Sequence, residues 1–148
     1  MRSRNNDHPL QSGSAREPKG KSRPTLPRKV AIGYARVAAP SQTAPRAGLD
    51  AQAAKIRARA RAEGIACVVV VEDNCESAHN LKRPGLMRLF RALDASPISV
   101  VITADLSRLA RNMPDLRRLL SRFARRGVAL IAVEESLDTN TTEGRRTL

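Results

Sequence analysis

The amino-acid sequence predicts an α/β fold with three layers, in which helices flank a mostly parallel central sheet of about four strands. Short apolar runs alternate along the chain with longer segments whose apolar residues recur at helical spacing. The short runs are largely apolar at both odd and even positions, which is typical of strands buried in the middle of a sheet. Strands that alternate with helices form parallel βαβ units, so both observations indicate the same fold class.

The first strand is expected at residues 30–37, where the run Val-Ala-Ile-Gly-Tyr-Ala-Arg-Val begins the ordered part of the chain. A loop containing Pro, Ala and Ser follows at 38–47. The next segment, from about Leu49 to Glu63, predicts a helix that ends at Gly64, because glycine readily adopts the left-handed conformation found just after helices. The stripe that this helix would bury consists of Leu49, Ala53, Ile56 and Ala60.

The remaining elements continue this alternation: a strand at 66–71, a loop at 72–83, a helix that opens at Pro84, a strand at 98–102, a helix that ends at Gly127, a strand at 128–133, and a polar segment at 134–148 that could begin another helix. The helix opening at Pro84 would bury Leu86, Leu89, Phe90 and Leu93. The later helix would start after an N-cap at Asn112, with Asp115 facing the helix dipole. Its buried stripe would be Leu116, Leu119, Leu120 and Phe123.

The size and charge of the chain limit its organisation and its partners. Because 41% of its 148 residues are hydrophobic, we expect one domain at residues 29–148. Residues 1–28 are basic, rich in proline and poor in large apolar side chains, so this N-terminal tail is expected to be disordered. The net charge of +13 attracts polyanions such as nucleic acid. An Arg- and Ala-rich coding bias would also make the chain basic without a binding role, and the tail could be a leader without function.

The composition disfavours several classes of function. Aromatic residues make up 2% of the chain, which is too few for platforms that stack single-stranded nucleic acid. Cys67 and Cys75 occur without a CxxC motif or a His at ligand spacing, so we expect free thiols and no metal site. The sequence has neither an apolar run of membrane-spanning length nor the apolar core of a signal peptide. The expected location is therefore the cytoplasm, without membrane contact.

Three arginines follow the expected ends of two strands. Arg36 lies at the carboxyl end of the first strand, where open α/β sheets place their ligand crevices. Arg108 and Arg111 come just after the third strand and share a face if that turn is helical. Clustered guanidiniums repel one another, so such a cluster usually receives an anion such as a phosphate. The alternative is that Arg36 is a surface residue and that the other two only flank the start of a helix.

Several short motifs occur in one order along the chain: Gly33-Tyr34-Ala35-Arg36-Val37, Gln42, Leu49-Asp50-Ala51-Gln52, Asp73, Ser77, Arg83-Pro84-Gly85-Leu86, Ser107-Arg108-Leu109-Ala110-Arg111-Asn112, and Asp138-Thr139 with Gly144. From about Val30 to the last residue, this order resembles the catalytic domain of the serine recombinases, the resolvase/invertase family. The resemblance implies a recombinase without metal or cofactor, in which a Ser hydroxyl attacks a phosphodiester of double-stranded DNA and forms a phosphoseryl link. Subunits then rotate within a tetramer before the ends are rejoined.

The resemblance also implies roles for individual residues. Arg36, Arg108 and Arg111 would hold the scissile phosphate. Gln42 and Arg83 would support that pocket. The loops around it would be organised by Gln52, Asp73 and Ser77.

The chain departs from the family pattern at the position that matters most. The nucleophile of the family follows the Tyr-Ala-Arg-Val motif, and Ala38 occupies that position here. A methyl group cannot attack phosphorus, and loss of a nucleophile costs on the order of 10⁶ in rate in a well-studied hydrolase. Ser41 and Thr43 are hydroxyls in the same loop, but nothing in the sequence positions them. Ser107 stands where many relatives carry Asp, and Ala78 where the family favours Gly.

A further departure is length, since the sequence stops before the long dimer helix and the DNA-reading domain of the family. We therefore expect DNA binding that is weak, salt-sensitive and nearly independent of sequence.

Three interpretations of the function stay open. The first is a recombinase domain that is catalytically impaired, and the second is a non-catalytic protein that associates with DNA, with itself as a dimer or tetramer, or with intact recombinase subunits. The third, a small nucleotide-binding α/β protein, is disfavoured because GxGxxG and GxxxxGK[ST] motifs are missing.

Overall fold

The computed structural model describes residues 28–38 and 45–148. The expected tail up to residue 27 lies outside the described residues, as do Ser41, Gln42 and Thr43. The described elements are, in chain order, β1 (Val30–Arg36), α1 (Pro45–Ala62), β2 (Ala66–Asp73), α2 (Pro84–Ala95), β3 (Val100–Thr103), the short 3₁₀ helix η1 (Leu106–Arg108), α3 (Met113–Arg125), β4 (Ala129–Ala132), β5 (Leu137–Asp138) and α4 (Thr142–Arg146).

The expected α/β fold with a mostly parallel sheet is confirmed. The strands lie in the order β2-β1-β3-β4-β5. β1 pairs in parallel with β2 and β3, and β3 pairs in parallel with β4. β5 runs antiparallel to β4 and was not expected, because a strand of two residues is too short to show an alternating pattern. Among the described residues the sheet therefore has one strand more than the four expected.

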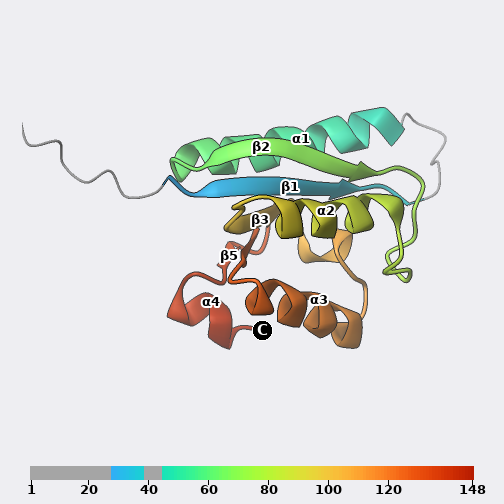
Figure 1. The fold of residues 1–148 in the computed structure, drawn as a ribbon. Helices are drawn as coiled ribbons and strands as arrows, with labels where there is room; N and C mark the ends of the chain where they lie inside the picture. The colour runs from blue at the N-terminus through green and yellow to red at the C-terminus, as the bar shows by residue number, and fades with distance from the viewer. Residues whose placement is uncertain (1–27, 39–44) are drawn as a thin grey trace, which may run out of the picture.

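The sheet lies between helices on both faces, which gives the three layers (Figure 1). Alternation along β1 assigns its side chains to the two faces, since Ile32 and Tyr34 pack with residues of α2 and α3 while Ala31 and Ala35 pack with residues of α1. The α1 layer comes very close to the strand. A Cβ atom at Gly33 would lie 2.8 Å from methyl carbons of both Ile56 and Val70, so glycine lets α1 and the neighbouring strand β2 pack closely there.

The helix ends follow local signals, and the capping predictions are confirmed. Gly64 and Gly127 have φ angles of 65° and 66°, as expected for glycines that end helices. The Asn112 side chain accepts a hydrogen bond from the backbone N–H of Asp115 at 2.8 Å, which makes it the N-cap of α3. α1 begins at Pro45, earlier than expected, because proline is well suited to a first helical turn.

Six strand boundaries differ from the expectation by one or two residues, and three of these differences have an identifiable reason. β2 continues to Asp73, because this residue still pairs with Arg36 of β1. β3 begins at Val100, because the N–H of Ile98 bonds within a turn instead of across the sheet. β4 begins at Ala129, because the N–H of Val128 donates to a carbonyl in the last turn of α3.

The strand order reverses direction between β1 and β3. The chain leaves β1 through α1 to reach β2 on one side, and returns through α2 to reach β3 on the other side. In open α/β sheets, ligands bind at the carboxyl ends of the strands where the order reverses in this way. Arg36 ends β1, and η1 with Arg108 follows β3, so both meet at this point. Within 28–38 and 45–148, no helix combines the length and the apolar character needed to cross a bilayer.

Candidate functional site

Arg36 is a buried charge that joins the end of β1 to the loop after β2 and to η1. The residue is 1% exposed. Its Nε donates to the carbonyl of Arg108 at 3.0 Å, and its terminal nitrogens donate to the carbonyls of Glu76 at 2.8 Å and Ser107 at 3.1 Å. Burial, followed by the positive charges of Arg83, Arg108 and Arg111, lowers the pKa of Arg36. The three carbonyls therefore provide the solvation that water would otherwise give to this guanidinium.

Gln52 of α1 holds the backbone of Arg36 in place. Its side-chain oxygen accepts from the N–H of Arg36 at 3.0 Å, and its side-chain nitrogen donates to the carbonyl of Arg36 at 3.0 Å. The carbonyl also accepts from a terminal nitrogen of Arg108 at 3.2 Å. The amide of Gln52 thus satisfies both backbone polar groups of Arg36 from the α1 face and fixes the end of β1.

Asp73 connects the end of β2 to the start of α2. It is 3% exposed and accepts hydrogen bonds from the hydroxyl of Tyr34 at 2.7 Å, the N–H of Gly85 at 2.6 Å and the N–H of Leu86 at 3.0 Å. A carboxylate at this position also interacts favourably with the positive end of the helix dipole. Burial, together with the hydrogen bond to Asp73, raises the pKa of Tyr34, so the phenol stays protonated and donates to the carboxylate.

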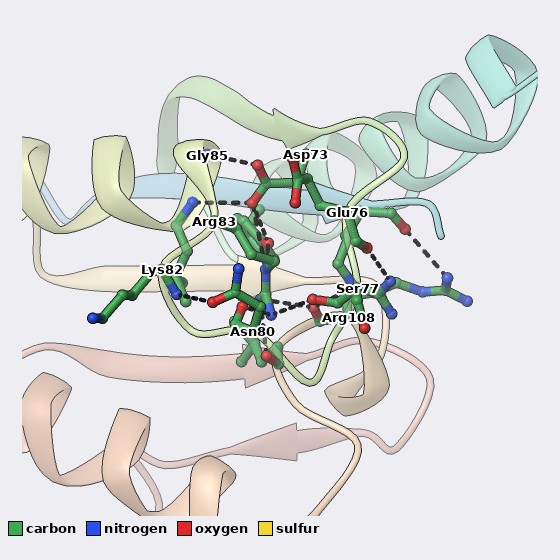
Figure 2. A network of polar contacts seen from close by, with 12 residues as sticks. Asp73, Glu76, Ser77, Asn80, Lys82, Arg83, Gly85 and Arg108 are labelled. Atoms are coloured by element: carbon green, nitrogen blue, oxygen red, sulfur yellow. Dashed lines mark hydrogen bonds and ion pairs between the residues drawn. The ribbon is translucent and has the colours of Figure 1, made fainter. Parts of the chain in front are cut away.

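Arg83 is fully buried next to this carboxylate, and its Nε lies 3.5 Å from an oxygen of Asp73. The same nitrogen donates to the hydroxyl of Tyr34 at 2.9 Å. Its terminal nitrogens donate to the carbonyls of Asn80 at 3.1 Å and Leu109 at 2.9 Å, with longer bonds to the carbonyls of Ser77 and Arg108. Figure 2 shows how Arg83 links Asp73 above it to the loop at Ser77 and Asn80. The loop before α2 is thereby tied to the segment after β3.

Arg108 and Arg111 are the accessible charges of the cluster. The Arg108 side chain is 31% exposed, and its Nε lies 2.8 Å from Asp105. Arg111 is exposed and close enough to contribute to the pKa of Arg36. Asp105 also accepts a hydrogen bond from the hydroxyl of Ser107. Burial by itself would raise the pKa of Asp105, but the hydrogen bonds from Ser107 and Arg108 outweigh it and lower the pKa.

Ala38 lies at the edge of the described part of the site. It is half-buried and follows Val37, whose N–H donates to the carbonyl of Asp73 at 3.1 Å and whose carbonyl accepts from the N–H of Glu76 at 3.2 Å. Ala38 is thus attached to a segment that is fixed to the neighbouring loop. Ser77 belongs to that loop, where its hydroxyl accepts from the N–H of His79 at 3.2 Å.

The four expected arginines therefore fall into an inner, buried pair and an outer, more accessible pair. Arg36 and Arg83 are buried and bonded to backbone carbonyls, whereas Arg108 is half-buried and Arg111 is exposed. An anion such as a phosphate would reach the outer two arginines first. Gln42 lies outside the described residues.

Two residues of the site were missed or undervalued on sequence grounds. Asp105 positions Arg108, and its place two residues after β3 was the available signal. Glu135 accepts a hydrogen bond from the N–H of Leu106 at 3.0 Å and so supports the start of η1. No signal in the sequence connects Glu135 to Leu106, because a side chain that accepts from a backbone N–H places no demand on the residue type of its partner.

Comparisons with known proteins identify the family of this chain. The family described as "Resolvase, N terminal domain" matches residues 31–148. An integrase-like protein, y4lS, from Sinorhizobium fredii is 32% identical over 114 residues, which cover 77% of this chain and 55% of that protein. The chain thus spans about half the length of this curated relative.

Two solved structures extend the comparison to the fold. The N-terminal catalytic domain of TP901-1 integrase superposes with a TM-score of 0.74 at 26% identity, covering 80% of this chain and 88% of that one. A resolvase family site-specific recombinase from Streptococcus pneumoniae superposes with a TM-score of 0.68 at 25% identity, covering 81% and 82%. The family match spans most of the chain and includes every described residue of the arginine cluster, so the chain belongs to the resolvase N-terminal domain family of serine recombinase catalytic domains.

Proposed function

We propose that this chain is a serine recombinase domain that binds the DNA phosphate at its arginine cluster but does not cleave it. The observation that supports the proposal is that buried arginines bonded to carbonyls are close in the chain to a position without a nucleophile. Arg36 and Arg83 are held by carbonyls from several loops, while Ala38 stands two residues after Arg36. The polar scaffold that would position a reacting phosphate is kept, and the atom that would attack it is missing.

The chemistry follows from the charges of the site. A phosphodiester gains negative charge as a nucleophile adds to it, and guanidiniums stabilise that charge without a metal. Arg108 and Arg111 would contact the phosphate, whereas Arg36 and Arg83 would add a fixed positive field from behind. With a methyl group at Ala38, no covalent link forms at this position, and the rate of cleavage falls by on the order of 10⁶.

Binding to DNA through this site is expected to be weak and independent of sequence. The exposed groups of the cluster are guanidiniums, which contact phosphates and carry no sequence information by themselves. The logarithm of the binding constant falls linearly with the logarithm of the salt concentration, and each phosphate neutralised in duplex DNA steepens this fall by about 0.9. Contacts from Arg108 and Arg111 alone would therefore give a slope of about 1.8.

The test is a search for the covalent intermediate. The chain and its Ala38→Ser variant are each joined to the DNA-reading part of a relative with a known site, and SDS-resistant protein–DNA adducts are measured. The relative's own catalytic domain on the same DNA-reading part serves as the control. We expect adducts from the control and from Ala38→Ser, and none from the unaltered chain. An adduct at Ser41 of the unaltered chain contradicts the proposal, as does an Ala38→Ser fusion that stays inactive while the control cleaves.

The same observation favours a second candidate, a non-catalytic subunit that acts through an intact recombinase. A folded domain with Ala38 could enter an assembly with active subunits and block the strands that it holds. Addition of this chain should then inhibit recombination by a relative in trans, in proportion to its concentration. The Ala38→Ser variant should inhibit less. Equal inhibition by both proteins would show that the missing nucleophile is not the cause.

A further inference from the structure

A basic groove lies along α3. It has a volume of about 600 Å³ and is lined by Arg117, Arg118, Ser121, Arg122 and Arg125, with Leu81 and Pro114 also in its wall. We call this surface the α3 groove. Four of the residues that line it are arginines, and Leu81 belongs to the loop between Ser77 and Arg83 that the buried network ties down.

The arginines of the α3 groove differ in how far they are already engaged. Arg118 pairs with Asp115 at 3.0 Å, and the guanidinium of Arg122 lies 3.5 Å from the ring centre of Phe90. Arg117 and Arg125 are exposed, and neither forms an ion pair or a side-chain hydrogen bond with any residue in 28–38 or 45–148. Their positive charge is therefore available to a ligand.

The position of α3 connects the groove to the arginine cluster. Helices of a parallel α/β fold begin at the carboxyl ends of the strands, and α3 begins two residues after Arg111. Figure 1 shows α3 running from that end of the sheet back towards the C-terminus. At 1.5 Å per residue, its 13 residues rise by about 20 Å, whereas phosphates of one DNA strand are spaced about 3.4 Å along the helix axis. The groove arginines extend from Arg117 to Arg125, a rise of about 12 Å, so the α3 groove is long enough to follow about three to four phosphates.

We propose that the α3 groove binds the phosphate backbone of duplex DNA next to the arginine cluster. The inference rests on the proposed function, because it places the same DNA molecule across both surfaces. Duplex DNA fits better than a single strand, because the aromatic ring at this surface, Phe90, is 3% exposed and covered by Arg122, which leaves no platform for stacking bases. Exposed charges repeated along one helix face match a ligand whose charge also repeats at regular intervals.

The test compares two double variants with the same change in charge. Arg117→Gln with Arg125→Gln removes two free charges from the α3 groove, and Arg57→Gln with Arg61→Gln removes two exposed charges from α1 on the opposite face of the sheet. Fluorescence anisotropy with a labelled 20-base-pair duplex of random sequence gives the Kd between 50 and 200 mM salt. Circular dichroism establishes that both variants are folded.

We expect the groove variant to lower the log–log salt slope by about 1.8, so the increase in Kd from 50 to 200 mM salt becomes about tenfold smaller. The α1 variant should keep a slope close to that of the unaltered chain. Equal slopes for the two variants would overturn the inference. It would also be overturned if the groove variant lost self-association or capture by an intact recombinase while its DNA slope stayed unchanged, because the groove would then be a protein contact.

A third variant separates this inference from the proposed function. Arg108→Gln with Arg111→Gln removes the accessible charges of the cluster and leaves the α3 groove intact. If this variant binds DNA as the unaltered chain does while the groove variant does not, the groove binds DNA and the proposed phosphate site is wrong. If the cluster variant loses affinity and the groove variant does not, the proposed function stands and the groove inference fails.

Discussion

Replacement of Asp73 by Asn should destabilise the fold more than any exposed carboxylate replacement. The Asp73 carboxylate faces the fully buried guanidinium of Arg83 and accepts from Tyr34 and two N–H groups at the start of α2. Removal of one partner from a buried ion pair leaves the other charge uncompensated and typically costs about 3–5 kcal/mol. Asn keeps one oxygen as an acceptor, so we expect the free energy of unfolding to fall by about 3 kcal/mol, at the lower end of this range.

This loss is measured by urea denaturation followed by circular dichroism, and a loss of about 3 kcal/mol corresponds to a fall in Tm of roughly 6–12 °C for a chain of this size. The chain has one Tyr and no Trp, so intrinsic fluorescence reports directly on Tyr34 beside the altered group. The control is Asp94→Asn, which removes an exposed carboxylate that pairs with Arg126 at 2.7 Å. The control should change the midpoint little, because exposed ion pairs contribute little. Similar shifts for both variants would refute the reasoning that the buried carboxylate compensates Arg83.

Three further predictions concern the elements around the site. Gly33→Ala should cost about 1–3 kcal/mol in chemical denaturation, because its Cβ would lie 2.8 Å from a methyl carbon of Ile56; an unchanged midpoint would mean that α1 can move away freely. Asn112→Ala removes the N-cap of α3 and should cost about 1 kcal/mol, whereas Asn112→Asp should restore most of the stability. The lowered pKa of Asp105 contributes stability that is present above its unfolded pKa of about 3.9 and is lost as the pH falls through the folded pKa. The difference in unfolding free energy between the unaltered chain and Asp105→Asn should therefore shrink from pH 6 to pH 2, and a difference that is independent of pH would contradict this assignment.

Much of the fold and part of the site were predictable from the sequence, because the responsible interactions are local. The glycines that end α1 and α3 and the Asn112 cap depend on residues within one turn of each other. The buried faces of the helices follow from periodicity alone. The membership of the arginine cluster was also expected, because Arg36 and Arg108 each lie close after a strand and parallel strands end at the same edge of the sheet.

The tertiary structure alone decided which arginines of the cluster are buried and which backbone groups they contact. The resemblance predicts that Arg36 holds a phosphate, and this role stays a prediction; the structure adds that Arg36 is 1% exposed and bonded to three carbonyls. Arg83 likewise lies among carbonyls that belong to two separate loops. Every residue carries a backbone carbonyl, so a bond to one leaves no trace in the residue types of the partner segment. The sequence by itself determined which charges are present and near which strand ends they lie, but which of them are buried depended on how distant loops fold over the sheet.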